Sequence, residues 1–123
     1  MRVLLIDDSR AIRSVLRNIL TDMGFEVSEA GHGQEALERL KEQSKTDLAL
    51  VDWNMPVMNG IEFVRAVRAN HAYDDLLLMM VTTESGMDRM IEALEAGANE
   101  YVMKPFTKDM LQGKMELLGV FPS

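Results

Sequence analysis

The sequence predicts an α/β domain, a (βα)5 doubly wound sandwich in which a five-stranded parallel sheet is covered by helices on both faces. The first observation behind this prediction is that short apolar runs alternate with amphipathic segments along all 123 residues. The second is that three of the runs are apolar throughout, as expected for strands buried on both faces. These runs are Val3–Ile6, Leu48–Val51 and Leu76–Val81.

The first strand leads into the helix with the clearest pattern. Its apolar side chains recur at i, i+3, i+4, i+7, i+8 and i+11 from Ile12 to Met23, which is the periodicity of an amphipathic helix. Ser9 or Asp8 can cap the start of this helix. Gly24 stands where a helix often ends in a left-handed residue.

The remaining elements show weaker forms of the same signals. Phe25–Ala30 predicts the second strand and Tyr101–Met103 the fifth. Apolar residues three or four apart predict the other helices, at Ala36 to Leu40, Ile61 to Val67, Met87 to Leu94 and Met110 to Leu118. Gly97 ends the fourth helix and Thr107 caps the fifth. Gly113 should leave the fifth helix frayed or short, because an internal glycine costs about 1 kcal/mol relative to alanine.

The composition predicts one soluble, cytoplasmic domain over residues 1–123, and we expect it to be a monomer. There is no cysteine, and the longest apolar run, Leu76–Val81, is far shorter than the roughly 20 residues of a membrane helix, so no membrane partner is expected. Acidic residues outnumber basic ones by 20 to 13, and the basic residues form no run, which argues against nucleic acid as a partner. His32 and His71 lack a metal-spaced partner and should be surface residues.

Four of the predicted strands end in residues that can carry chemistry. These are Asp7 and Asp8 after the first strand, Asp52 after the third, Thr82 and Thr83 after the fourth, and Lys104 after the fifth. Because the carboxyl ends of parallel strands share one edge of the sheet, these groups should lie together. Crowded carboxylates repel one another and need a cation, and oxygen ligands without His or Cys suit Mg2+. Lys104 and Thr82 can then hold a phosphoryl group.

Taken singly, each of these groups has an ordinary structural explanation. Asp7 and Asp8 can cap a helix, and Asp52 can form a turn. Thr82 can simply end a strand, and Lys104 can be a solvated loop residue. The functional interpretation therefore depends on their joint placement at one edge, where acids suit a cation and the hydroxyl and ammonium suit an anion.

Longer motifs surround these strand ends. They are Asp7-Asp8, the loop Asp52-Trp53-Asn54-Met55-Pro56 followed by Met58-Asn59-Gly60, Thr82, and Tyr101-Val102-Met103-Lys104-Pro105-Phe106-Thr107. In these motifs the chain resembles response regulator receiver domains, and most closely the stand-alone CheY-type chemotaxis receivers. The resemblance covers nearly the whole chain and implies the flavodoxin-like sheet order 2-1-3-4-5. Ser9 departs from the family, which has an aromatic residue there, and Thr83 stands where a smaller residue is usual.

The resemblance implies a metal-assisted phosphoacceptor site. Asp52 would accept a phosphoryl group from a phosphohistidine of a CheA-like sensor histidine kinase. Asp8 and Asp52 would ligate Mg2+ directly, the backbone carbonyl of Asn54 would be a third ligand, and Asp7 would act largely through water. Such a site works mainly by positioning and charge neutralisation.

The resemblance also implies how the phosphoryl group would be held and read. Lys104, Thr82 and the backbone N–H of Thr83 would contact its oxygens, while Glu84, together with Asn54, would tune its hydrolysis. When Thr82 moves to the phosphoryl group, Tyr101 would turn from outside to inside. This turn would reshape the face formed by the fourth helix, fifth strand and fifth helix, where methionines such as Met87 and Met90 could contact a partner.

The function implied is a two-component switch without an output domain, which catalyses its own phosphorylation and dephosphorylation and is not otherwise an enzyme. Its partner would be a flagellar motor switch protein in chemotaxis, with a phosphatase as a further partner. The runner-up is a phosphorelay intermediate that passes the phosphoryl group to a histidine phosphotransfer protein. A Mg2+-dependent aspartyl phosphohydrolase is less favoured, because its signature places an acid where Asn54 stands. A flavodoxin-like flavin protein is disfavoured because Asp7-Asp8 would repel the flavin phosphate.

Overall fold

The structure is a computed structural model that describes residues 1–43 and 45–122. Within these residues the strands are β1 (Arg2–Ile6), β2 (Glu26–Ala30), β3 (Leu48–Val51), β4 (Leu77–Thr82) and β5 (Glu100–Met103). The helices are α1 (Arg10–Asp22), α2 (Gly33–Glu42), α3 (Gly60–Arg68), α4 (Met87–Ala96) and α5 (Lys108–Leu117), with a short 3-10 helix η1 (His71–Tyr73). The strands pair in the order β2-β1-β3-β4-β5 and all run parallel, which confirms the predicted fold class and strand order.

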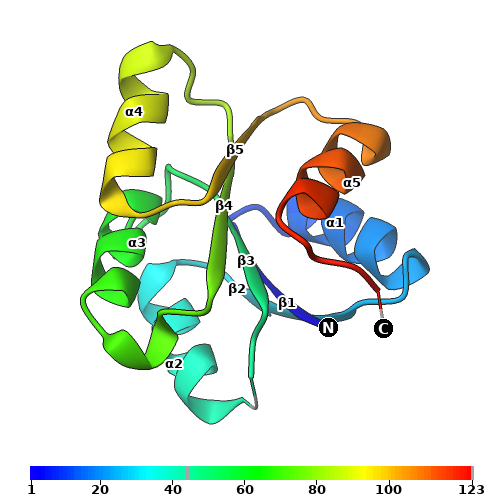
Figure 1. Cartoon of the computed structure of the whole chain (residues 1–123), viewed down its shortest axis with the longest axis horizontal. Coiled ribbons are helices and arrows are strands. Elements are labelled where there is room, and N and C mark those ends of the chain that lie inside the picture. The colour runs from blue at the N-terminus through cyan, green and yellow to red at the C-terminus, as the bar shows by residue number, and fades with distance from the viewer. Residues whose placement is uncertain (44, 123) are drawn as a thin grey trace.

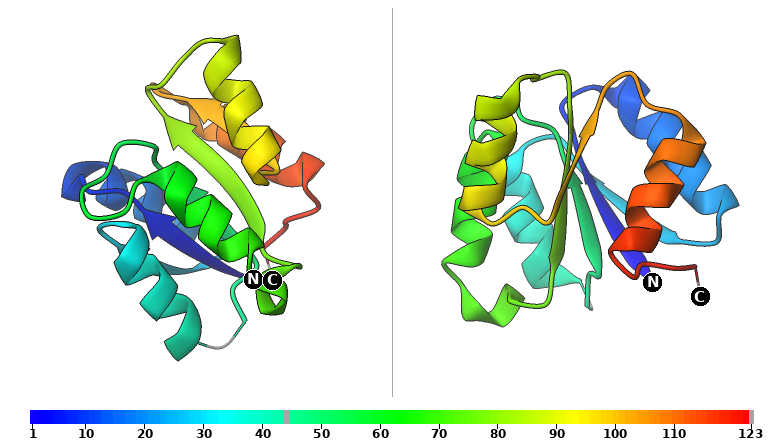
Figure 2. Two further views of the ribbon diagram at one scale, coloured as in Figure 1. Left: turned by 90° about the vertical axis from the view of Figure 1, so that its left-hand side faces the viewer. Right: turned by 45° about the horizontal axis from the view of Figure 1, so that its top comes forward.

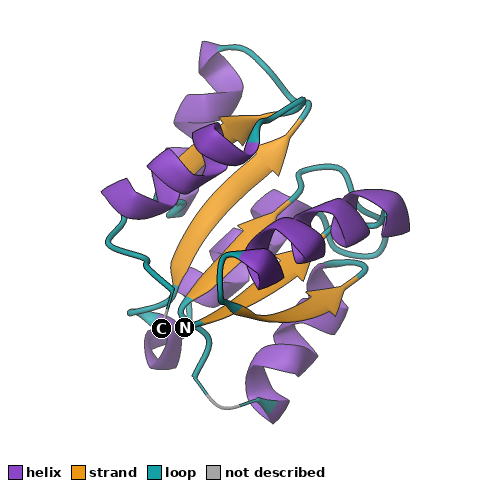
Figure 3. Cartoon of the chain, turned by 90° about the vertical axis from the view of Figure 1, so that its right-hand side faces the viewer, coloured by secondary structure: helices purple, strands orange, loops and turns teal. Residues whose placement is uncertain are grey.

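The sheet is the middle layer of three. Figures 1 and 2 show α2, α3 and α4 on one face and α1 and α5 on the other. Figure 3 shows the strands running in one direction through the twisted sheet. The side chains of β1 alternate accordingly, since Leu4 and Ile6 join the core under α2, α3 and α4 while Val3 and Leu5 join the core under α1 and α5. Burial on both faces explains why the central strands are apolar throughout.

Local hydrogen bonds account for most of the helix ends. The Ser9 hydroxyl accepts from the backbone N–H of Ile12 at 3.3 Å, so Ser9 and not Asp8 caps α1. Gly24, with φ of 97°, follows the last turn of α1 as predicted. The Thr107 hydroxyl accepts from the N–H of Met110 at 3.1 Å and caps α5.

Two predictions about single residues were wrong. Gly113 does not fray or shorten α5, which runs unbroken from Lys108 to Leu117, because the Thr107 cap and the burial of Leu111 and Met115 hold the helix. His32 is half-buried instead of free on the surface, and its Nδ1 accepts from the N–H of Glu35 at 3.2 Å to cap α2.

Other expectations held or gained detail. The His71 side chain is 92% exposed, as predicted, but the 3-10 helix that it begins was not foreseen. β4 extends to Thr82, so this threonine belongs to the strand and not to the loop after it. Among the helices in residues 1–43 and 45–122, none combines the length and the hydrophobicity of a membrane-spanning segment.

Candidate functional site

The predicted site residues meet where the strand order reverses. β1 lies between β2 and β3, and ligands of open α/β sheets bind outside the carboxyl ends of strands at such a point. The register pairs Ile6 with Val51, so Asp7 and Asp52 leave neighbouring strands side by side. On the other side of β3, the Lys104 N–H donates to the Thr82 carbonyl at 2.9 Å. The structure thus brings the ends of β1, β3, β4 and β5 to one edge.

Three carboxylates gather at this edge. Asp7, Asp8 and Asp52 each offer an oxygen within 4.8 Å of the others. Asp7 is 3% exposed and Asp52 is 9% exposed, whereas Asp8 is open to solvent. Across residues 1–43 and 45–122 this is the one cluster of at least three potential metal ligands. Oxygen donors alone, with one carboxylate open to solvent, suit a hard divalent cation such as Mg2+ that keeps part of its water.

Lys104 reaches into the acid cluster from β5. Its Nζ donates to Asp7 Oδ2 at 2.8 Å and lies 3.6 Å from Asp52 Oδ2. The other oxygen of Asp7 accepts from the Ser9 N–H at 2.9 Å, so both Asp7 oxygens have a donor. Each carboxylate oxygen has a further lone pair, so these two bonds orient Asp7 and still leave it able to face a metal ion or a metal-bound water.

The surroundings of Asp52 disfavour its charged form. Burial raises the pKa of Asp52, and the negative charge of Asp7 raises it further. Lys104, a hydrogen bond from the Trp53 N–H at 2.8 Å and the Thr82 hydroxyl act in the opposite direction. Asp52 is therefore a buried carboxylate beside one ammonium and one hydroxyl donor, groups that can also stabilise negative charge on a phosphoryl oxygen.

The loop after Asp52 is fixed by the start of α3. The Gly60 N–H donates to the Trp53 carbonyl at 2.9 Å, and a Cβ atom on Gly60 would lie only 2.2 Å from the Asp52 carbonyl oxygen. Only glycine allows this approach. Asn59 and Glu62 form a reciprocal capping box at the same helix start. The sequence thus places a rigid support directly behind Asp52.

The β4–α4 loop links the site to Tyr101. Thr82 is fully buried, and its hydroxyl accepts from the Glu84 N–H at 3.1 Å. The Tyr101 hydroxyl donates to the Glu84 carbonyl at 2.6 Å. Burial raises the pKa of Tyr101, and the Glu84 charge adds to this effect. Thr83 is exposed at the rim of the site and Asn54 is exposed in the loop after β3.

Two arginines near the site were not predicted. Arg13, on the first turn of α1, donates to the Asp7 backbone carbonyl and pairs with Glu29 at 3.0 Å. Its place four residues after the Ser9 cap could have suggested this contact. Arg89, on α4, lies over the Trp53 ring with Cζ 5.1 Å from the ring centroid. No local pattern in the sequence marks that contact, because it joins two segments far apart in the chain.

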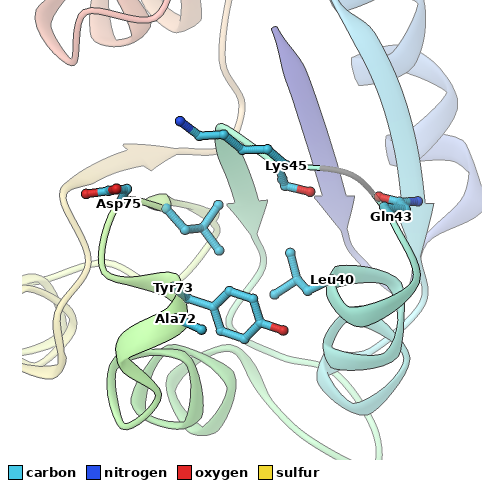
Figure 4. Close-up of a pocket in the computed structure, with 8 residues that line it drawn as sticks. Leu40, Gln43, Lys45, Ala72, Tyr73 and Asp75 are labelled. Atoms are coloured by element: carbon cyan, nitrogen blue, oxygen red, sulfur yellow. The ribbon is translucent and has the colours of Figure 1, made fainter.

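A separate hollow lies at the opposite edge of the sheet. Figure 4 shows it between the end of α2 and η1, with Leu40 and Tyr73 on its wall and the side chains of Lys45 and Asp75 at its rim. Its volume is about 340 Å3, and its lining comes from segments that precede β3 and β4. None of the strand-end acids lines this hollow, so it is not part of the candidate site.

Comparison with known proteins identifies the family. The model of the response regulator receiver domain matches residues 3–116. The chain belongs to the response regulator receiver family. It is 43% identical over 119 residues to the chemotaxis protein CheY1 of Helicobacter pylori, covering 96% of each chain. It is 44% identical over 117 residues to the chemotaxis protein CheY of Pseudomonas aeruginosa, covering 94% of each chain.

Solved structures of receivers share the whole fold. The chemotaxis protein CheY4 of Vibrio cholerae superposes with a TM-score of 0.88 at 37% identity, covering 94% of this chain and 96% of that one. The response regulator TrrA of Thermotoga maritima, solved in complex with Mg2+ and BeF, gives a TM-score of 0.83 at 32% identity, covering 95% and 97%. The family and fold predicted from the motifs are therefore confirmed, and this receiver is a signalling phosphoacceptor.

Proposed function

We propose that this receiver is a chemotaxis response regulator in which Asp52 accepts a phosphoryl group from a CheA-like histidine kinase. The observation that carries the proposal is the placement of Asp52, buried beside Asp7 and 3.6 Å from the Lys104 ammonium at the switch point of the sheet. The chemotaxis proteins that the chain resembles over nearly its full length support the pathway. A cytoplasmic location and a monomeric state stay predictions.

Phosphoryl transfer would follow from this placement. A carboxylate oxygen of Asp52 attacks the phosphorus of the phosphohistidine, a P–O bond forms, and the P–N bond breaks with its electron pair returning to the imidazole of the kinase. Lys104 leaves Asp7 to contact a phosphoryl oxygen, and the Thr82 hydroxyl and Thr83 N–H hold another. Asp8, Asp52 and the Asn54 carbonyl would hold Mg2+, which supplies positive charge to the phosphoryl oxygens when bound.

The same site would remove the phosphoryl group by hydrolysis. Asn54 and Glu84 lie on the loops that flank Asp52, where they can position or exclude the attacking water. A phosphatase partner would act at this same opening. The chain therefore catalyses reactions of its own aspartate, and a phosphohydrolase acting on small substrates is less favoured because Asn54 replaces the acid that such enzymes carry two residues after the nucleophile.

The output surface is proposed on α4, β5 and α5. This face carries an apolar hollow of about 430 Å3 beside Tyr101, lined also by Met110 and Leu117, and the Met87 side chain on the neighbouring helix is 69% exposed. Tyr101 is 6% exposed, so the proposed switch requires that its ring can also adopt an outward position. When the Thr82 side chain turns to the phosphoryl group, its hydrogen bond from the Glu84 N–H is lost. The β4–α4 loop, whose Glu84 carbonyl accepts from the Tyr101 hydroxyl, can then shift. A flagellar motor switch protein fits this output, and a histidine phosphotransfer protein is the alternative.

Trp53 provides the first test of the site. Titration with Mg2+ should change the fluorescence of this sole tryptophan because it adjoins Asp52, and acetyl phosphate should change it further only when Mg2+ is present. Asp8→Asn should weaken the Mg2+ response. An unchanged signal at saturating Mg2+ in wild type would count against the acid cluster as the metal site.

Partner affinity provides the test of output. The affinity for a flagellar motor switch protein should rise when beryllofluoride with Mg2+ occupies the site of wild type. Thr82→Ala should take up the phosphoryl group yet lose most of this rise, and Tyr101→Ala should lose binding more than phosphorylation. The same rise in Thr82→Ala as in wild type would show that Thr82 does not couple the site to α4, β5 and α5. A rise only for a histidine phosphotransfer protein would favour the relay.

A further inference from the structure

Arg89 connects α4 to the loop that carries Asp52. Its guanidinium lies over the Trp53 ring, with Cζ 5.1 Å from the ring centroid, a distance at which cation–π attraction acts. Trp53 is only 6% exposed although it sits in a loop, and its backbone N–H donates to Asp52 Oδ1 at 2.8 Å. Arg89 therefore lies over the residue that directly orients the phosphoacceptor.

The same guanidinium pairs with Glu84. Arg89 Nε lies 3.7 Å from Glu84 Oε1, and Arg89 Nη1 lies 3.4 Å from Glu92 Oε1 on the next turn of α4. The charges of Glu84 and Arg89 shift the pKa of Tyr101 in opposite directions, as expected if the arginine offsets the glutamate near the Tyr101 hydroxyl. Arg89 thus faces the Glu84 carboxylate, and the Glu84 backbone N–H donates to the Thr82 hydroxyl at 3.1 Å beside a site that holds three other carboxylates.

α4 has few other ways to hold this end of the helix in place. Of its ten residues only Ala93 is buried, and Gly86 at its start provides no side-chain cap. The loop before it, from Thr83 to Gly86, is held by the Thr82 and Tyr101 hydroxyls through Glu84. The Arg89 contacts to Trp53 and Glu84 supply a further link between this helix start and the site.

We propose that Arg89 is a positioning residue for the phosphorylation reaction. Arg89 lies over Trp53 and offsets the charge of Glu84, and it thereby favours the approach of an anionic phosphodonor. Glu84 is tied to the site through Thr82, so its negative charge opposes the approach of an anionic donor such as acetyl phosphate. The planar guanidinium can contact the indole and the carboxylate together, which a lysine ammonium does less well. The inference rests on the proposed phosphorylation of Asp52.

The test is the second-order rate constant for acetyl phosphate with saturating Mg2+, read as the phosphorylated fraction by intact mass. Arg89→Gln should lower this rate constant roughly three- to tenfold at low ionic strength and less at high ionic strength, because salt screens exposed charges. If Arg89 acts by offsetting Glu84, then Glu84→Gln should remove most of the defect, so that Glu84→Gln/Arg89→Gln differs from Glu84→Gln by less than about twofold.

Arg65→Gln is the matched control. Arg65 also pairs with α4, through Glu92 at 3.5 Å, and its removal changes the net charge by the same amount without touching Trp53 or Glu84. It should leave the rate constant within about twofold of wild type. A second readout needs no phosphorylation: acrylamide quenching of Trp53 should increase in Arg89→Gln, increase less in Arg89→Lys and stay unchanged in Arg65→Gln.

The outcomes separate the two proposals. If wild type takes up no phosphoryl group, the proposed function fails and the kinetic role of Arg89 fails with it. If wild type is modified but Arg89→Gln matches it in rate and quenching, only the Arg89 inference is wrong. A lowered rate constant that does not depend on salt, that persists in the Glu84→Gln background or that appears equally in Arg65→Gln would also overturn the inference. Such a result would indicate general loss of structure.

Discussion

Removing the charge of Asp52 should stabilise the metal-free protein. Asp52 is 9% exposed, and burial together with the Asp7 charge raises its pKa. A carboxyl group whose pKa is higher in the folded state adds stability that is fully present below its unfolded pKa and is lost as the pH rises through the folded pKa. At neutral pH the charged form therefore costs free energy, and Asp52→Asn removes that cost.

The magnitude follows from the two nearest charges and the burial. With an effective dielectric constant of about 20, the repulsion from the Asp7 carboxylate, which has an oxygen within 4.8 Å, is at least roughly 3.5 kcal/mol, and the attraction across 3.6 Å to the Lys104 ammonium is roughly 4.6 kcal/mol. These two contributions nearly cancel, so the desolvation of the Asp52 carboxylate decides the sign. We expect Asp52→Asn to raise the free energy of unfolding by about 1–2 kcal/mol at neutral pH.

The assay is urea unfolding in EDTA between acidic and neutral pH. The gain of Asp52→Asn over wild type should be near zero at low pH, where wild-type Asp52 is protonated, and should grow as the pH rises. Asp75→Asn, an exposed acid at the opposite edge of the sheet, is the control for loss of one negative charge and should change little. Added Mg2+ should stabilise wild type more than Asp52→Asn. Equal midpoints for wild type and Asp52→Asn in EDTA at every pH would refute the reasoning.

Three further predictions concern the supports of the site. Gly60→Ala should lower the free energy of unfolding by about 1–3 kcal/mol in urea and reduce the Mg2+ response of the tryptophan, because its Cβ atom would meet a backbone oxygen at 2.2 Å; an unchanged midpoint would contradict this. Tyr101→Phe should cost about 1 kcal/mol in the same assay through its lost 2.6 Å hydrogen bond, and no cost would mean that water replaces it. Burial raises the pKa of Glu29, but the hydrogen bonds from Arg17 and Arg13 lower this pKa by more, so the net shift is downward. The pairing of Glu29 therefore stabilises the fold above the ordinary pKa of a glutamate, and this stabilisation is lost on acidification. The urea midpoints of wild type and Glu29→Gln should therefore converge as the pH falls from about 6 to about 3, and a constant difference would contradict this pairing.

The strand-end chemistry was predictable because it depends on order along the chain. Once Val3–Ile6 and Leu48–Val51 are assigned as parallel strands, Asp7 and Asp52 must leave the same edge of the sheet, and the register confirms that they are neighbours. The periodicity of α1 and the caps at Ser9 and Thr107 were equally readable, because each depends on residues within one turn of each other.

What the sequence did not predict depends on contacts between distant segments or on local fit. The place of Arg89 over Trp53 needs the packing of α4 beside the β3–α3 loop, which no periodicity encodes. His32 looked like a surface residue because its role is a single hydrogen bond at a helix start. Gly113 looked like a break, but one glycine's helix propensity is outweighed by the buried side chains on either side of it.

The most direct measurement of the central claim is the intact mass of the protein after incubation with phosphoramidate and Mg2+. We predict that one phosphoryl group is added to wild type and that none is added when EDTA replaces Mg2+. Asp52→Asn should remain unmodified, and Asp75→Asn should be modified to the same extent as wild type. Asp52→Asn keeps the shape of the side chain and changes the nucleophile. Modification of Asp52→Asn to the wild-type level, or of wild type in the absence of any divalent metal, would contradict the assignment of Asp52 as the phosphoacceptor.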